Sequence, residues 1–238
     1  MLPFLRLLLP LAVLACGASP PPPEEPVEIA PTRLRGQALF TGEARPSATE
    51  IGRIDPTCAA LQEAASETIE DGLERVFVYL ADPPPSAVPG PPPREALTIT
   101  AKRCQYEPAV VGLRVGQRVV LENGDPTLHQ PVTAQPDGNE LRLEQPFEGM
   151  RSELRFDRPR LMAEVSCASH PWMKAHLGVL DHPWFAVTDA AGGFEIPAPP
   201  TGDHTLIAWH PELGERRAAV TVTAGLATEV VLDFAAAP

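Results

Sequence analysis

One short segment of the chain carries three side chains that bind soft metal ions. Cys167, His170 and Met173 follow one another at every third position, and a further histidine, His129, lies upstream. Two imidazoles, a thiolate and a thioether are the ligand set of a mononuclear copper site that transfers single electrons, with the methionine sulfur as a long, weak axial ligand. The spacing predicts that the first three side chains converge from one loop and that His129 joins them from a neighbouring strand.

The elements that must position these side chains are predicted to be strands. Short stretches rich in Val, Ile, Leu and Thr are separated by Gly, Pro, Asn or Asp, a pattern typical of a β-sandwich. An Ala- and Glu-rich stretch over 59–69 is the predicted helical exception, and it follows Asp55-Pro56-Thr57, a segment that can cap the start of that helix. Predicted strands of the first domain cover 35–40, 75–80, 97–101, 110–115, 118–122, 140–143, 153–156 and 162–165.

The metal-binding pattern resembles that of the cupredoxins. Their loop C-x-x-H-P-F-M corresponds to the stretch from Cys167 to Met173, and their N-x-x-x-x-P-H-N segment corresponds to the stretch from Asn123 to Gln130. The resemblance covers residues 97–182 and implies a Greek-key β-sandwich that holds one type 1 copper ion. It also implies the roles of the ligands: the equatorial ones are His129, Cys167 and His170, and the axial one is Met173.

Two neighbours of these ligands depart from the cupredoxin pattern. The family usually has Asn after the upstream histidine and Ser or Thr after the cysteine, and these polar groups tie the two ligand loops together. This chain has Gln130 and Ala168 at those places. We therefore expect a looser connection between the loops and an altered reduction potential, with no ligand lost.

Other polar residues near the motif allow two interpretations. Asp125 either orients His129 from outside the metal shell or simply begins an Asp-Pro turn. His176 and His182 either extend the metal cluster or have structural roles, and the structural role is the commoner one for such residues.

The N-terminal residues are typical of an export signal. Residues 1–15 are an apolar run with one early arginine, too short to span a bilayer as a mature helix. The run ends before Cys16 in a pattern that resembles the lipobox of bacterial lipoproteins, which implies a lipid anchor on that cysteine and a place in the cell envelope, at the outer membrane or in the periplasm. The alternative is an ordinary signal peptide with an incidental cysteine. Residues 16–32 are rich in proline and are predicted to form an extended tether.

Three cysteines remain after Cys16. Spare thiols in an oxidising compartment tend to pair. If Cys167 is a metal ligand, Cys58 and Cys104 form the disulfide. If Cys167 is instead one of the paired cysteines, the metal motif is accidental.

Two folded domains are predicted. The copper domain spans 33–182 and contains a proline-rich insertion at 83–93, and residues 183–238 form a second, small β-sandwich of the transthyretin or immunoglobulin-like type. From Trp184 onward the strand pattern starts again, and the stretches 188–196, 200–206 and 208–211 resemble the carboxypeptidase-regulatory-like module. That resemblance implies a packing or interaction role without catalytic residues.

Charge and missing motifs limit the classes of function. The chain has 31 Asp and Glu against 19 Lys and Arg, a formal net charge of −12, so no nucleic-acid partner is expected. It has no nucleophile elbow, phosphate loop or zinc-protease motif, and four protein ligands leave no open metal position for a substrate, so no enzyme is expected. The expected function is electron transfer to or from a redox partner protein of the envelope. The alternatives are a copper carrier or storage lipoprotein, and a metal-free structural or interaction module.

Overall fold

The structure is a computed structural model that describes residues 32–40, 55–63, 72–84, 90–134 and 139–234. These residues form strands and one short helix, so the predicted all-β class is confirmed. No helix among them is long and apolar enough to cross a membrane. In chain order the elements are β1 (Arg33–Leu39), α1 (Pro56–Glu63), β2 (Phe77–Leu80), β3 (Leu97–Lys102), β4 (Gln105–Glu107), β5 (Val110–Arg114), β6 (Arg118–Asn123), β7 (Pro131–Ala134), β8 (Glu140–Arg142), β9 (Arg151–Arg155), β10 (Arg160–Cys167), β11 (Lys174–Leu180), β12 (Phe185–Val187), β13 (Gly193–Pro197), β14 (Gly202–His210), β15 (Gly214–Val222) and β16 (Ala227–Asp233).

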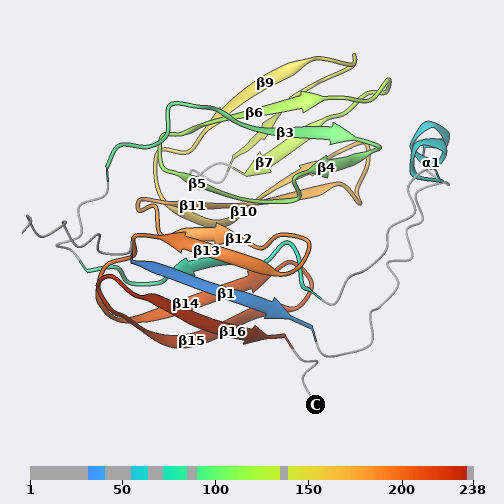
Figure 1. The fold of residues 1–238 in the computed structure, drawn as a ribbon. Coiled ribbons are helices and arrows are strands. Elements are labelled where there is room, and N and C mark those ends of the chain that lie inside the picture. Colours follow the sequence, from blue (N-terminus) through green and yellow to red (C-terminus); the bar gives the residue numbers. More distant parts are fainter. Residues whose placement is uncertain (1–31, 41–54, 64–71, 85–89, 135–138, 235–238) are drawn as a thin grey trace, which may run out of the picture.

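Two sheets enclose the first hydrophobic core, in the upper half of Figure 1. One sheet has the strand order β5-β11-β10-β7-β8 and the other the order β4-β3-β6-β9. Both sheets contribute to one buried cluster, with Ile99 on β3, Leu121 on β6 and Leu177 on β11 among its members. This arrangement is the β-sandwich that the sequence predicts.

Buried and more exposed residues alternate along β10 and β6, and this alternation brings polar side chains to one end of the first sandwich. Along β10, the buried positions are Ala163, Val165 and Cys167, at every second residue. The buried row of β6 ends in the same way at Asn123. Because both rows point between the sheets, Cys167 and Asn123 close the core at its end.

The second sandwich contains two strands that were expected in the first domain. Its sheets have the orders β13-β1-β16 and β12-β2-β14-β15, so β1 and β2 pair with strands from the C-terminal part of the chain. The expected division, with 33–182 in one domain and 183–238 in the other, is therefore wrong for residues 33–39 and 77–80. The alternation of apolar residues determines which face a strand buries, but it does not determine which sheet the strand joins.

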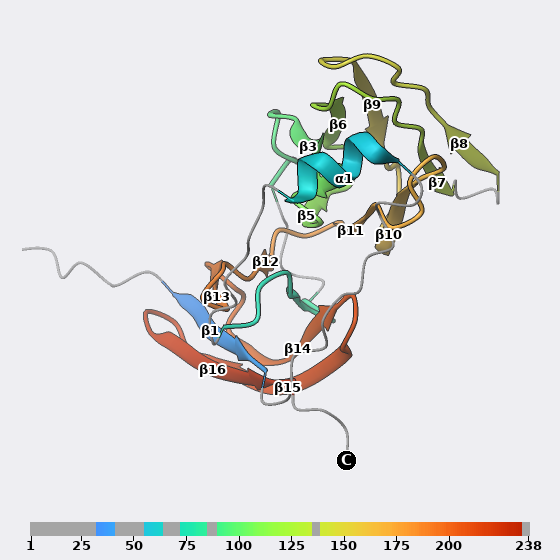
Figure 2. The ribbon, with the colours of Figure 1, turned by 90° about the vertical axis from the view of Figure 1, so that its right-hand side faces the viewer.

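Helix α1 lies between β1 and β2 in the chain, yet it packs on the first sandwich. Figures 1 and 2 show it beside the end of that sandwich, next to the turn between β3 and β4. Cys58 and Leu61 of the helix pack against the first core. The predicted cap is present, and Asp55 is the residue of the segment that provides it, since its Oδ1 accepts the backbone N–H of Thr57 at 2.7 Å. The helix ends at Glu63, and the rest of its predicted length lies outside the described residues.

Strand β2 joins the two sandwiches because it is buried on both faces. All four of its residues are buried. Val78 and Leu80 belong to the second core, whereas Phe77 and Tyr79 form a separate cluster with residues of β5, β11 and β14. An uninterrupted apolar strand is the sequence pattern of such a doubly buried element.

A buried histidine in the second sandwich makes its stability depend on pH. Burial, and to a lesser degree the positive charge of Arg75, lower the pKa of His210 from 6.5 to about 4. Its Nδ1 also accepts the backbone N–H groups of Glu212 at 3.2 Å and Leu213 at 3.3 Å, contacts that a protonated ring would lose. The folded chain therefore requires neutral His210.

We expect this histidine to destabilise the fold in mild acid. Between pH 6.5 and about 4 the unfolded chain binds a proton that the folded chain does not, so the free energy of unfolding should fall by roughly 2 to 3 kcal/mol as the pH decreases through this window. Denaturant unfolding at a series of pH values measures the change. In His210→Asn, which keeps an acceptor for the two N–H groups, the slope in this window should become smaller. An unchanged slope would contradict the assignment.

Candidate metal centre

Three of the predicted ligands converge at the end of the first sandwich. The Sγ atom of Cys167 lies 3.9 Å from Nδ1 of His129 and 3.6 Å from Nδ1 of His170, and the two Nδ1 atoms are 3.1 Å apart. All three side chains are buried. Donors about 2.0–2.3 Å from a shared metal ion lie about 3.1–4.0 Å from one another in a roughly trigonal arrangement, so the spacing of these atoms fits one ion.

The cysteine sulfur is held by the loop of the neighbouring histidine. The backbone N–H of Gln130 donates to Cys167 Sγ at 3.3 Å. The Gln130 carbonyl accepts the N–H of Ala168 at 2.9 Å, and its side-chain Oε1 accepts the hydroxyl of Ser169 at 2.7 Å. The expectation of a looser connection between the ligand loops is therefore wrong. The hydroxyl that ties them lies one residue further along the chain than in the cupredoxin pattern.

The ring of His129 is positioned by a carboxylate from its own loop. Asp125 Oδ2 lies 3.1 Å from His129 Nε2, and both side chains are almost fully buried. Asn123 supports this loop, because its Oδ1 accepts the N–H of Asp125 and its Nδ2 donates to the carbonyls of Thr127 and Gln145. Of the two interpretations of Asp125, the structure supports the orienting one.

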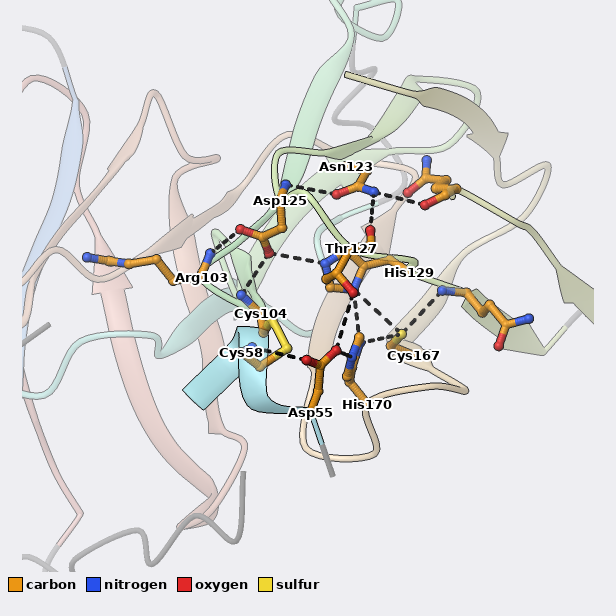
Figure 3. A network of polar contacts seen from close by, with 12 residues as sticks. Asp55, Cys58, Arg103, Cys104, Asn123, Asp125, Thr127, His129, Cys167 and His170 are labelled. Atoms are coloured by element: carbon orange, nitrogen blue, oxygen red, sulfur yellow. Dashed lines mark hydrogen bonds and ion pairs between the residues drawn. A yellow bond between two sulfur atoms is a disulfide. The ribbon is translucent and has the colours of Figure 1, made fainter. Parts of the chain in front are cut away.

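The ring of His170 is positioned by a carboxylate from a distant part of the chain. Asp55, at the start of α1, places Oδ2 3.0 Å from His170 Nε2, and the hydroxyl of Thr127 donates to the same oxygen at 3.2 Å. Figure 3 shows this carboxylate beside the His170 ring, and the Asp125 carboxylate beside His129. Only 2% of His170 is exposed.

These contacts determine which ring nitrogens face the sulfur. An ionised carboxylate only accepts hydrogen bonds, so each histidine uses its Nε2–H to donate to its aspartate. Both Nδ1 atoms then point at one another and at Cys167. The chain thus presents two imidazole nitrogens and one sulfur toward a common point, which is the geometry of a cation site.

The contacts within the centre also shift the pKa values of its cysteine and histidine side chains in the metal-free protein. Burial by itself would raise the pKa of Cys167, but hydrogen bonds from His129 and His170 outweigh it and lower the pKa to about 5. Burial would likewise lower the pKa of His129, but Asp125 and the Cys167 sulfur raise it to about 9. In the metal-free protein these contacts therefore favour a thiolate at Cys167 and a protonated ring at His129.

The fourth predicted ligand lies in the same loop. Met173 is buried in the first core, and its backbone N–H donates to the carbonyl of His170 at 2.9 Å. Its carbonyl accepts the N–H of Cys167 at 3.2 Å, which closes the loop. Trp172 lies against the His170 ring and donates its indole N–H to the Cys104 carbonyl at 3.0 Å.

The other candidate residues have the following places. The Cys58–Cys104 disulfide is present and Cys167 is a free, buried thiol, as the metal interpretation predicts. His176 packs against Trp209, and His182 stacks on Trp184. Neither belongs to a cluster of ligands among the described residues, and both have packing roles. Cys16, the signal peptide and all but the last residue of the tether lie outside the described residues.

The sequence alone does not place Asp55 at this site. Its only signal was a helix cap, and nothing in the spacing connects residue 55 with a histidine at 170. Gln145 was also missed: it pairs through its backbone with His129, and its side chain donates to the carbonyl of Leu121 at 2.8 Å.

Solved cupredoxin structures are similar to part of this chain. An amicyanin variant in its Cu(I) form is 20% identical over 35% of this chain and 81% of its own length, with a TM-score of 0.31. A purple cupredoxin from Nitrosopumilus maritimus is 22% identical over 35% of this chain and 98% of its own length, with a TM-score of 0.29. A second amicyanin variant is 17% identical over 43% of this chain and 97% of its own length, with a TM-score of 0.32. No protein-family model and no curated protein matches the chain. Amicyanins and other cupredoxins are thus what about a third of this chain resembles.

Proposed function

We propose that this protein is a one-electron carrier with a single copper ion held by His129, Cys167 and His170, and by Met173 as a weaker fourth ligand. The observation that carries the proposal is the convergence of two Nδ1 atoms and one sulfur at mutual distances of 3.1 to 3.9 Å. Copper bound there would supply a one-electron Cu(II)/Cu(I) couple.

The donor set supports copper over other ions. Thiolate and thioether sulfur are soft ligands, and two imidazoles with one thiolate in a plane are the arrangement used by copper electron-transfer sites. Zinc sites with a structural role have four strong ligands, usually several thiolates, and this cluster has one thiolate. A metal ion with four protein ligands has no open position for a substrate, which favours a carrier of electrons over an enzyme.

The environment of the site favours electron transfer over transport of the metal. His129, Cys167 and His170 are each at most 2% exposed, and both histidines are held by carboxylates. A protein that delivers copper needs ligands that an acceptor can approach and replace. A rigid, buried ligand set keeps the same geometry in both oxidation states, which suits a carrier that cycles between them.

The place of action is part of the proposal. A lipid anchor on Cys16 and the proline-rich tether would keep the folded part close to the surface of the envelope membrane. There the protein would accept one electron from a reduced partner protein and pass it to an oxidised one. With a formal net charge of −12, a partner with a basic docking face would meet it most readily.

The test is titration of the metal-free full chain with Cu(II), followed by absorption spectroscopy, EPR and voltammetry. We expect an intense thiolate-to-copper charge-transfer band, narrow hyperfine splitting, saturation at one ion per chain and a reversible one-electron wave. A modest chelator should not remove the metal in either oxidation state. Loss of copper to such a chelator on reduction would support the alternative of a protein that transports copper. A colourless protein would reject the copper proposal.

A further inference from the structure

Both histidines of the centre have a carboxylate on the nitrogen that faces away from the sulfur. Asp125 lies 3.1 Å from His129 Nε2, and Asp55 lies 3.0 Å from His170 Nε2. Partners of this kind orient the ring of a metal ligand and fix its tautomer. The two carboxylates come from segments far apart in the chain, so something must hold them at one site.

The disulfide connects the segments that hold these carboxylates. The backbone N–H of Cys58 donates to Asp55 Oδ1 at 3.3 Å, and the backbone N–H of Cys104 donates to Asp125 Oδ2 at 2.8 Å. The Cα atoms of the two cysteines are 5.4 Å apart. Each half of the disulfide therefore donates to the carboxylate of one histidine, as Figure 3 shows.

The turn that carries Cys104 is bent toward Asp125. Arg103 and Cys104 have φ angles of 52° and 55°, in the left-handed region that residues other than glycine seldom adopt. In this conformation both of their backbone N–H groups point at Asp125, which accepts them at 2.7 and 2.8 Å. The two residues with left-handed backbone conformation are thus the same two that donate to Asp125.

Helix α1 reaches the site from the other sandwich. It follows β1 and precedes β2, which both belong to the second sandwich. The covalent bond between Cys58 and Cys104 ties the helix to the first sandwich. The sulfur atoms of this bond also lie within 4.8 Å of a His170 ring nitrogen, so the bond is adjacent to the ligand itself.

We propose that the Cys58–Cys104 disulfide is a positioning element of the metal centre, which keeps both carboxylates on their histidines and covers the outer edge of His170. The inference rests on the proposed copper function for its metal-bound consequences. Its consequences for the two rings hold in the metal-free protein as well, so the two proposals can be tested separately.

The test compares the full chain with two variants, the double variant Cys58→Ser/Cys104→Ser and Asp55→Asn. The amide oxygen of an asparagine at position 55 can accept from the helix N–H groups or from His170, but not from both, so the contact with the ring is lost while the helix keeps a good cap. Nitrogen NMR of the imidazoles in the metal-free proteins should show Nε2-protonated His170 in the wild type and mixed tautomers in both variants.

Copper affinity gives a second, independent measurement. Competition with a chelator should show Cu(II) binding 10- to 100-fold weaker in each variant, a typical loss when the partner of a ligand is removed. Removal of the disulfide in the Asp55→Asn background should cost less than in the wild type, because both changes act partly through the same contact. The matched control is Asp189→Asn: this carboxylate also accepts two backbone N–H groups, from Ala191 and Gly193, but it lies in the second sandwich.

The outcomes separate the two proposals. Unchanged ring tautomers and unchanged copper affinity in a folded, disulfide-free variant would overturn the positioning role and leave a purely structural crosslink. Altered tautomers in a protein that binds no copper even as wild type would support the positioning role and reject the copper function. If the double variant does not fold, reduction of the wild-type disulfide by a water-soluble phosphine provides the same comparison.

Discussion

Replacement of Cys167 by serine should abolish the thiolate-to-copper charge-transfer band and weaken Cu(II) binding by more than about 100-fold. The cysteine supplies the only free thiol among the described residues, and its sulfur is within 3.9 Å of both histidine Nδ1 atoms. A serine hydroxyl is a hard, protonated donor at neutral pH and cannot replace the thiolate. Optical titration of the two proteins measures the band and the affinity together.

Two further variants show whether this loss belongs to the ligand set. Met173→Leu removes the proposed axial sulfur, so it should keep the charge-transfer band and shift the reduction potential. His176→Asn changes a histidine that packs against Trp209 outside the cluster, and its copper spectrum should match that of the wild type. A charge-transfer band that persists in Cys167→Ser would place the metal elsewhere.

Replacement of Phe77 by alanine should lower the free energy of unfolding by about 3 to 5 kcal/mol. The Phe77 side chain is fully buried between the two sandwiches and stacks on Tyr79, with ring centroids 5.4 Å apart. On the other side its ring lies so close to Gly178 of β11 that a Cβ atom there would overlap it. Removing the ring leaves a cavity at the junction, which chemical denaturation of the wild type and variant would measure.

The opposite substitution tests the same contact. Gly178→Ala adds the Cβ atom that the ring excludes, so we expect the sandwiches to separate locally and the free energy of unfolding to fall by about 1 to 3 kcal/mol. In Phe77→Ala the added methyl has room, and Gly178→Ala should cost much less there. Additive losses in the double variant would show that the two residues do not meet.

The residue types in the ligand loop determined most of the candidate site. Cys167, His170 and Met173 follow one strand at fixed spacing, so their proximity is local and can be predicted. The disulfide was predictable on two conditions, that Cys16 carries a lipid and that Cys167 binds metal, because Cys58 and Cys104 are then the cysteines left to pair. The all-β class followed from strand periodicity and proline content.

Only the tertiary structure decided which sheets the first strands join and what surrounds the histidines. The apolar alternation of 33–39 is the same whether β1 lies beside β16 or in the other sandwich, because hydrogen bonding between strands involves the backbone and not residue type. Asp55 reads as a helix cap in the sequence, and it is one. Its second oxygen meets His170 only because a disulfide and a fold of two sandwiches bring together residues that lie 115 positions apart. Such a contact depends on the path of the whole chain, which no local pattern of residues encodes.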